Sequence, residues 1–276
     1  MSPTLAARID PVTRPKISFA SVNKFYGHHR SGAATTLALD DFSLDIAPEE
    51  IVSIVGPTGC GKSTALNLLA GFEKPSSGLV SVNEQAVTDP GPNRGVVFQQ
   101  PSLFPWLTVL SNVVLGIKCR GVAMEEYEPR ALRLLEEVGL KGFEKHYPYQ
   151  LSGGMQQRVQ IARALINEPD ILLMDEPFGA LDYQTRLLMQ KLLLRLWAHF
   201  KPTILFITHD VGEAIFISDR VIAMTKRPGR VKCVLDVNEP KPRGYEFIGS
   251  PEFTRLEREL VLAVQGEVEG DEVVTH

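Results

Sequence analysis

A glycine-rich segment at residues 56–63 has the residue types needed to hold a phosphate. It fits the pattern G-x-x-x-x-G-K-[ST], with lysine at 62 and serine at 63. Small residues let successive backbone amides curl around a phosphate at a helix N-terminus, while the lysine contacts the terminal phosphates and the hydroxyl binds Mg²⁺. The residues expected to bind ATP here are Gly56, Pro57, Thr58, Gly59, Cys60, Gly61, Lys62, Ser63 and Thr64. A chance glycine turn is the alternative, and the apolar strand expected at 51–55 and the helix expected at 62–70 make it less favoured.

Two acidic residues follow a short apolar run at 171–174. Asp175 is expected to bind the metal, and Glu176 to polarise the attacking water as general base. In an extended chain the two side chains point to opposite sides. Helix caps or solvated turn residues are the alternative, which the nearby phosphate loop disfavours.

A second phosphate-binding helix start is predicted at residues 151–158, Leu-Ser-Gly-Gly-Met-Gln-Gln-Arg. Ser152 occupies an N-cap position, and Gly153 and Gly154 expose backbone amides. One nucleotide does not need two such helix ends from one chain. This octet resembles the signature of the ATP-binding-cassette (ABC) ATPases, in which the signature of one subunit closes over ATP held by its partner. The resemblance implies that Ser152, Gly153, Gly154 and Gln156 contact nucleotide across a head-to-tail dimer.

The resemblance assigns roles to four more positions. Tyr26 matches the aromatic residue that stacks on adenine, and Gln99 matches the glutamine that reaches Mg²⁺ and water. Asp182 lies in a loop that communicates between paired sites, and His209 matches the histidine that senses the γ-phosphate. Taken singly, each has a structural alternative: a surface tyrosine, a polar strand end, a helix cap and a structural histidine. The residues expected to act in catalysis are Lys62, Gln99, Glu176 and His209, and the expected metal ligands are Ser63, Gln99 and Asp175.

Three segments, 90–95, 98–106 and 227–230, look most like ATPase subunits of nitrate, sulfonate and taurine importers. This resemblance implies uptake of a small anionic or sulfur- or nitrogen-containing solute, with ATP and Mg²⁺ as cofactors. It also implies membrane permease subunits contacted near 99–107, an external solute-binding protein acting indirectly, and a peripheral location at the cytoplasmic face of the inner membrane. Without the resemblance, the apolar segment 100–107 is expected to fold into the core. The longer loop at 28–36 and Gly212 depart from this group.

Two other functions are compatible with parts of this pattern. A soluble ABC ATPase acting on DNA or ribosomes is one, but the long coiled coil or second cassette typical of such proteins is not evident in the sequence. A small-molecule kinase with a phosphate loop is the other, and the signature octet argues against it. Co-purification with an integral membrane protein separates transport from both.

The surrounding pattern predicts the elements that position these residues. Alternating apolar residues at 17–22 and 37–46 predict antiparallel strands, and 95–98 is a further strand. Helices are expected at 109–118, 126–138, 183–200 and 211–217, and strands at 171–175, 203–208, 220–224 and 231–237. The resulting class is α/β, a P-loop NTPase core with an antiparallel β edge subdomain and an inserted α-helical subdomain at about 100–165. The expected domains are a flexible arm at 1–15, an ABC ATPase domain at 16–240 and a tail at 241–276 with a short helix.

The composition is that of an ordinary globular protein. Of 276 residues, 44% are hydrophobic and 22% charged, and the formal net charge of −4 argues against nucleic acid as a partner. Neither a membrane-spanning run nor a secretion signal is evident in the sequence. Cys60, Cys119 and Cys233 lack the spacing of a disulfide framework or a zinc site, which favours a reducing compartment.

Overall fold

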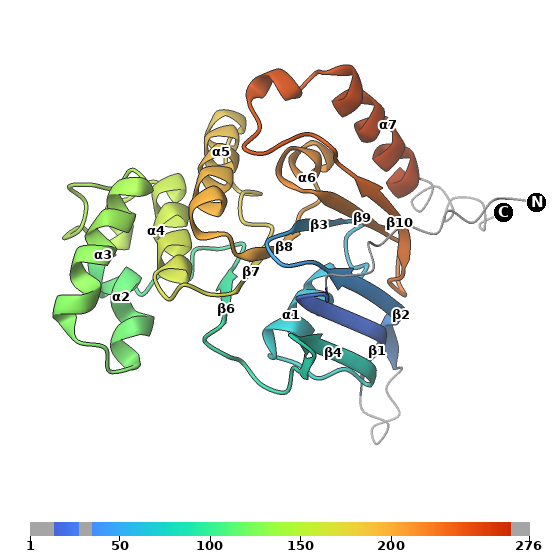
Figure 1. Cartoon of the computed structure of the whole chain (residues 1–276), viewed down its shortest axis with the longest axis horizontal. Coiled ribbons are helices and arrows are strands. Elements are labelled where there is room, and N and C mark those ends of the chain that lie inside the picture. The colour runs from blue at the N-terminus through green and yellow to red at the C-terminus, as the bar shows by residue number, and fades with distance from the viewer. Residues whose placement is uncertain (1–13, 28–34, 266–276) are drawn as a thin grey trace, which may run out of the picture.

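The strands form two sheets in the structure, a computed structural model that describes residues 14–27 and 35–265 (Figure 1). The first sheet has four strands in the order β2-β1-β4-β5, and all its neighbouring pairs are antiparallel. Its strands are β1 (Ile17–Tyr26), β2 (Thr36–Ile46), β4 (Ser77–Val82) and β5 (Gln85–Ala86). The edge sheet predicted from the sequence is confirmed, but β4 and β5 were not predicted.

The second sheet has six strands in the order β10-β9-β3-β8-β7-β6. Its strands are β3 (Ile51–Val55), β6 (Arg94–Val97), β7 (Ile171–Asp175), β8 (Thr203–Ile207), β9 (Arg220–Met224) and β10 (Val231–Asp236). All neighbouring pairs are parallel except β9 and β10. The parallel sheet is therefore confirmed, and the carboxyl ends of β3, β6, β7, β8 and β9 share one edge.

The helices cover the second sheet on both faces. Helix α1 (Lys62–Ala70) lies between the two sheets, and α5 (Tyr183–Phe200), α6 (Val211–Ile217) and α7 (Pro251–Gln265) cover the other face. Figure 1 shows α2 (Val109–Cys119), α3 (Met124–Glu137) and α4 (Gly153–Leu165) together in a lobe beside β6. Short 3-10 turns occur at Pro148–Gln150 and Tyr245–Phe247. None of the helices in the described ranges has the length and apolar character needed to cross a bilayer.

Two apolar clusters form the core, one on each face of the second sheet. Residues of the buried strands alternate between them: Val52 and Ile54 pack toward α1 and the first sheet, whereas Ile51 and Val55 pack toward the other helices. This period of two is the one expected for a strand buried on both faces. The strand that leads into the glycine loop is thus held from both sides.

The segment after β10 is attached to the body by a buried arginine. Arg243 is 3% exposed and donates hydrogen bonds to the carbonyls of Ile215, Phe216 and Ser218 at 2.7–3.1 Å. Burial lowers the pKa of its guanidinium to about 10. Helix α7 then buries one apolar face, formed by Phe253, Leu256 and Leu260. At 15 residues α7 is longer than the short helix predicted, because this apolar face continues over several turns.

Candidate functional site

A cavity of about 470 Å³ lies where the glycine loop meets the carboxyl edge of the second sheet. The glycine loop, β1, β2, the end of β7 and the turn after β9 all contribute to its walls. Its lining residues are Tyr26, Thr36, Ala38, Thr58, Gly59, Gly61, Lys62, Ser63, Thr64, Glu176 and Arg227. The cavity therefore collects many of the predicted residues, together with Thr36, Ala38 and Arg227, which were not predicted.

The loop at 56–63 takes a backbone conformation that requires glycine. Gly59 and Gly61 have φ of 77° and 106°, and a Cβ at Gly61 would lie 2.9 Å from the Ala38 carbonyl oxygen. The Lys62 ammonium folds back over the loop and donates to the carbonyls of Gly56 at 2.8 Å and Pro57 at 3.1 Å. A positive charge is thus held inside the curve of the loop.

Cys60 contributes its backbone to the loop, and its sulfur accepts a long contact of 3.9 Å from the Lys62 ammonium. Its side chain is 1% exposed and packs in the apolar cluster beneath the first sheet. Burial raises the pKa of the thiol, and the nearby Lys62 ammonium opposes that shift only in part. The thiol is thus a small core side chain rather than a reactive group.

Tyr26 ends β1 at the rim of the cavity. Its hydroxyl donates to Glu73 Oε1 at 2.9 Å and approaches Thr64 Oγ1 at 3.4 Å, and burial raises its pKa. The Lys24 ammonium lies over the ring, 5.0 Å from its centroid. A base that stacks on Tyr26 therefore has to use the opposite face of the ring.

Ser63 and Asp175 meet beside the loop. The Ser63 hydroxyl donates to Asp175 Oδ1 at 3.2 Å. Burial raises the pKa of the Asp175 carboxyl and Glu176 adds to this rise, while Ser63 and Lys62 oppose it. Two oxygen donors at the phosphate loop fit a hard cation such as Mg²⁺, which takes few protein ligands and completes its shell with phosphate oxygens and water. The described residues contain no cluster of three or more His, Cys, Asp or Glu able to hold a metal ion.

Glu176 and His209 lie together although they follow different strands. The Glu176 carboxylate Oε2 is 2.9 Å from His209 Nδ1. The extended conformation predicted for Glu176 is wrong: its φ is 44°, and its N–H donates to the Ile207 carbonyl at 2.9 Å. Strand β7 ends at Asp175, so a left-handed turn, and not the alternation of a strand, directs the Glu176 side chain to the cavity.

The signature residues lie elsewhere in the same chain, at the start of α4. The Ser152 hydroxyl caps this helix by accepting from the Met155 N–H at 3.3 Å, and Ser152 and Gly153 are exposed. Gly154 is partly buried against Thr185, and Gln156 Nε2 donates to the carbonyl of Pro148 at 3.0 Å. None of the four lines the cavity described above. In a single chain the signature and the glycine loop are therefore separate.

Gln99 and Asp182 also lie outside the cavity lining. Gln99 is exposed just after β6. The Gln160 amide, oriented to satisfy both groups, pairs with the backbone N–H of Phe98 at 2.6 Å and its carbonyl at 3.2 Å, which fixes the start of this loop. Asp182 caps α5, and hydrogen bonding to Thr185 lowers the pKa of its carboxyl. Within the single chain, Asp182 therefore acts as the helix cap of α5.

A guanidinium that sequence reasoning missed links two of the predicted loops. Arg186, on α5, donates from Nη1 to Asp210 Oδ2 at 2.8 Å and from Nη2 to the Leu181 carbonyl at 3.2 Å. Asp210 follows His209, and Leu181 precedes Asp182. The side chain therefore ties the loop of Asp182 to the turn of His209, a pairing that no local spacing in the sequence indicates.

The segment 98–107 presents aromatic side chains to solvent. Trp106 is 70% exposed and Phe104 is 36% exposed, with their ring centroids 5.5 Å apart. Asn112 holds the backbone beneath them: its Nδ2 donates to the Phe104 and Leu107 carbonyls at 3.1 and 3.0 Å, and its Oδ1 accepts from the Phe104 N–H. Folding into the core, the expectation without the family, is thus wrong for Phe104 and Trp106, although Leu103 packs against the core.

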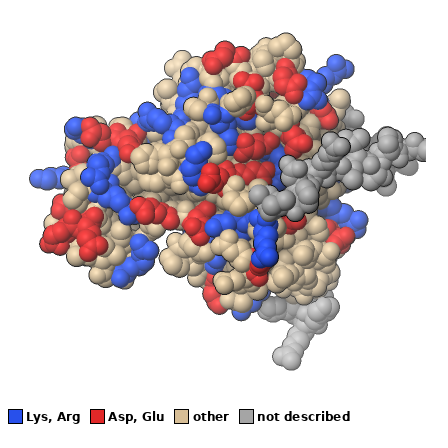
Figure 2. Space-filling model, in the orientation of Figure 1, with Lys and Arg blue, Asp and Glu red and all other residues tan. Residues whose placement is uncertain are grey.

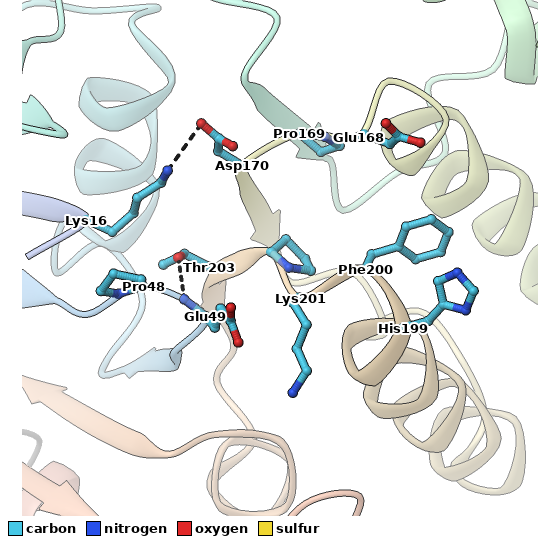
Figure 3. Close-up of a pocket in the computed structure, with 11 residues that line it drawn as sticks. Lys16, Pro48, Glu49, Glu168, Pro169, Asp170, His199, Phe200, Lys201 and Thr203 are labelled. Carbon is cyan, nitrogen blue, oxygen red and sulfur yellow. Dashed lines mark hydrogen bonds and ion pairs between the residues drawn. The ribbon is translucent and has the colours of Figure 1, made fainter.

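A second cavity, of about 500 Å³, lies at the opposite edge of the parallel strands (Figure 3). Lys16 and Asp170 form an ion pair across it at 3.2 Å, and Thr203 Oγ1 accepts from the Glu49 N–H at 2.9 Å. Asp170 and Thr203 lie where β7 and β8 begin, whereas ligands of such sheets bind at the carboxyl ends of strands.

On the face drawn in Figure 2, Lys and Arg alternate with Asp and Glu rather than forming one basic field.

Comparisons with known proteins converge on one family. A family model described as "ABC transporter" matches residues 39–179. The taurine import ATP-binding protein TauB of Rhizobium johnstonii is 48% identical over 231 residues, which cover 82% of this chain and 88% of that protein. The nitrate import ATP-binding protein NrtD of Synechocystis sp. is 44% identical over 238 residues, covering 84% and 90%. A solved dimeric structure of a post-hydrolysis state of the ATP-binding cassette MJ0796, bound to ADP and Pi, has a TM-score of 0.70 and 36% identity and covers 81% of this chain and 100% of that one.

Proposed function

This chain belongs to the ABC transporter family, and we propose that it powers an importer for a small anionic or sulfur- or nitrogen-containing solute of the nitrate, sulfonate or taurine type. Within that family it is an ATP-binding subunit that hydrolyses ATP. The import assignment is supported by the names of two relatives that each match more than four fifths of the chain. A soluble ABC ATPase unlinked to transport is not favoured by these relatives.

The observation that carries the proposed hydrolytic site is that Glu176 lines the cavity of the glycine loop and contacts His209. Lys62 and the loop amides offset the charge of the phosphates, and Tyr26 stacks on the adenine. Glu176 orients and deprotonates the attacking water, while His209 contacts the γ-phosphate beside that water. The 2.9 Å contact between His209 Nδ1 and Glu176 Oε2 supports a shared role for the pair.

Mg²⁺ fits beside these groups. Ser63 and Asp175 would hold it, with Gln99 as a further ligand, and the ion would supply positive charge next to the phosphates. The half-buried carboxylate of Asp175 supports this assignment, because a nearby cation would offset the burial that raises its pKa.

A head-to-tail dimer completes the site in this proposal. Ser152 and Gly153 are exposed at a helix N-terminus, away from the glycine loop of their own chain. A second copy brings them, with Gly154, Gln156 and the Asp182 loop, to the bound ATP. The similarity to a dimeric cassette bound to ADP and Pi supports this arrangement.

Membrane permease subunits are the proposed partners of the surface formed by 99–107. Its exposed aromatic side chains, held on a backbone fixed by Asn112, suit an apolar helix of a partner. The chain then lies at the cytoplasmic face of the inner membrane, and the external solute-binding protein acts on it only through the permease.

Co-assembly and uptake test this function together. The Trp106→Ala variant should lose co-purification with the permease while keeping its affinity for ATP, because the ring lies outside the nucleotide cavity. Leu262→Ala, which alters a similarly exposed apolar side chain on α7, is the matched control. Uptake of labelled taurine or nitrate should fail in a deletion strain and return with the wild-type chain. Normal uptake of both solutes in that strain would overturn the solute assignment.

A further inference from the structure

Arg227 is a cationic residue of the nucleotide cavity to which nothing above assigns a role. It lies in the turn between β9 and β10 and lines the cavity beside Thr58 and Gly59. Its Nε donates to the Gly59 carbonyl at 3.2 Å, so the guanidinium rests against the tip of the glycine loop. The residue thus comes from the far end of the sequence to the phosphate-binding segment.

The turn that carries Arg227 is fixed against the loop. The Gly229 N–H donates to the Ala38 carbonyl at 2.9 Å, and the Gly229 carbonyl accepts from the Asp40 N–H at 3.0 Å. A Cβ at Gly229 would lie 2.0 Å from the Cys60 carbonyl oxygen, so only glycine permits this approach. Arg230 adds an ion pair with Asp40. The position of Arg227 is therefore set by a rigid turn rather than by chance packing.

The charged side chains that line the cavity favour a phosphate-bearing ligand. Among the lining residues, Lys62 and Arg227 are cationic and Glu176 is the acid. Two of the three Lys62 donors are directed to loop carbonyls. A guanidinium has five N–H donors in a planar fork that matches phosphate oxygens, and within the described residues the one hydrogen bond recorded for Arg227 uses Nε. Its terminal nitrogens remain available to a ligand.

We propose that Arg227 binds the phosphate chain of the nucleotide directly, as a second cation beside Lys62. The proposal rests on the ATP-binding part of the proposed function and is independent of the transported solute. Arg227 then contributes charge from the β9–β10 turn that the glycine loop alone does not supply.

Charge-specific variants test this contact. Arg227→Gln keeps a donor for the Gly59 carbonyl but removes the charge, and it should weaken the binding of fluorescent ATP about tenfold, the loss typical of one hydrogen bond to a charged group. Arg227→Lys should recover part of this loss. The ratio of the ATP affinity of the wild type to that of Arg227→Gln should fall toward one in 0.5 M KCl, because added salt screens charge pairs. Arg255→Gln, which removes an exposed guanidinium on α7 outside the cavity lining, should bind ATP within about twofold of wild type.

Three results would overturn the proposal. Unchanged ATP affinity and dimerisation in Arg227→Gln would show that Arg227 does not contact the phosphates. A loss that is independent of salt and accompanied by a lower melting temperature would make Arg227 a support for the loop only. An unchanged monomer affinity with impaired ATP-dependent dimerisation would assign the side chain to the partner subunit. Failure of the wild-type chain to bind ATP at all would instead refute the nucleotide site, and Lys62→Ala serves as the reference for that loss.

Discussion

His209 Nδ1 lies 2.9 Å from Glu176 Oε2, although 33 positions separate the two residues in the sequence. They meet because β7 and β8 are parallel neighbours, with Asp175 opposite Ile207, so both residues leave the same edge of the sheet. The left-handed backbone of Glu176 turns its carboxylate toward the histidine. Water activation and γ-phosphate sensing are therefore proposed to act through one hydrogen-bonded pair.

The first prediction concerns the proposed general base. Glu176→Gln should keep ATP binding but lower hydrolysis by about 10²- to 10⁴-fold, because an amide does not accept the proton of the attacking water. ATP should then hold the two chains together as a stable dimer. Gel filtration with ATP and a phosphate-release assay measure both effects, with Lys62→Ala as a variant that does not bind. A Glu176→Gln protein that runs only as a monomer with ATP would count against the scheme.

A second prediction follows from the bridge made by Arg186. Arg186→Met removes the link between the Leu181 carbonyl and Asp210, so the two loops lose their common support. We expect kcat to fall about tenfold with little change in ATP affinity, since Arg186 does not line the cavity. Arg195→Met, on the same helix, is the control because its guanidinium contacts the Glu137 carbonyl instead. Equal kcat in both variants would show that the bridge is not needed.

The sequence predicted most of the second sheet because its strands are local apolar runs. Residues 51–55 are largely apolar and residues 171–174 are entirely apolar, and the structure has strands at 51–55 and 171–175. Strand β4 was missed for a physical reason. It contains Ser77, Gly78 and Ser81, and it exists through pairing with β1, about 60 residues earlier, which no local pattern reveals.

The site residues that belong to short sequence motifs could be predicted from the sequence. The glycine loop and the acids at 175–176 have fixed local spacing, and the structure brings Ser63 to Asp175. Arg227 and Arg186 have no such spacing, because their partners lie on distant elements of the chain. The backbone of Glu176 was mispredicted since the end of a strand is set by the next turn rather than by its own alternation.

The third prediction concerns pH and a buried carboxyl group. Glu213 is 4% exposed, and its burial raises the pKa of the carboxyl, whereas hydrogen bonds from Thr208 and Gln190 oppose the rise. The folded chain thus binds this proton more tightly than the unfolded chain. Between the ordinary and the raised pKa the folded state carries more protons, so the free energy of unfolding decreases as pH rises.

Replacing Glu213 by glutamine should remove this contribution. Urea unfolding at a series of pH values from about 5 to 8 should show a shallower decline in Glu213→Gln than in the wild type. Glu257→Gln, which alters an exposed side chain on α7, should follow the wild-type slope. Parallel curves for Glu213→Gln and the wild type would contradict the assignment.

The fourth prediction concerns the attachment of the C-terminal segment. Arg243→Met keeps an unbranched aliphatic side chain but leaves the carbonyls of Ile215, Phe216 and Ser218 without this donor. We therefore expect a loss of about 2–4 kcal/mol in the free energy of unfolding. Urea unfolding measures the loss, and hydrogen exchange should show faster exchange of the α7 amides, since the segment that leads to this helix loses its anchor. Arg255→Met, which removes an exposed guanidinium paired with Glu252 and Glu259 on α7, should change little. Wild-type stability together with wild-type α7 exchange in Arg243→Met would mean that the apolar face of α7 alone holds the segment in place.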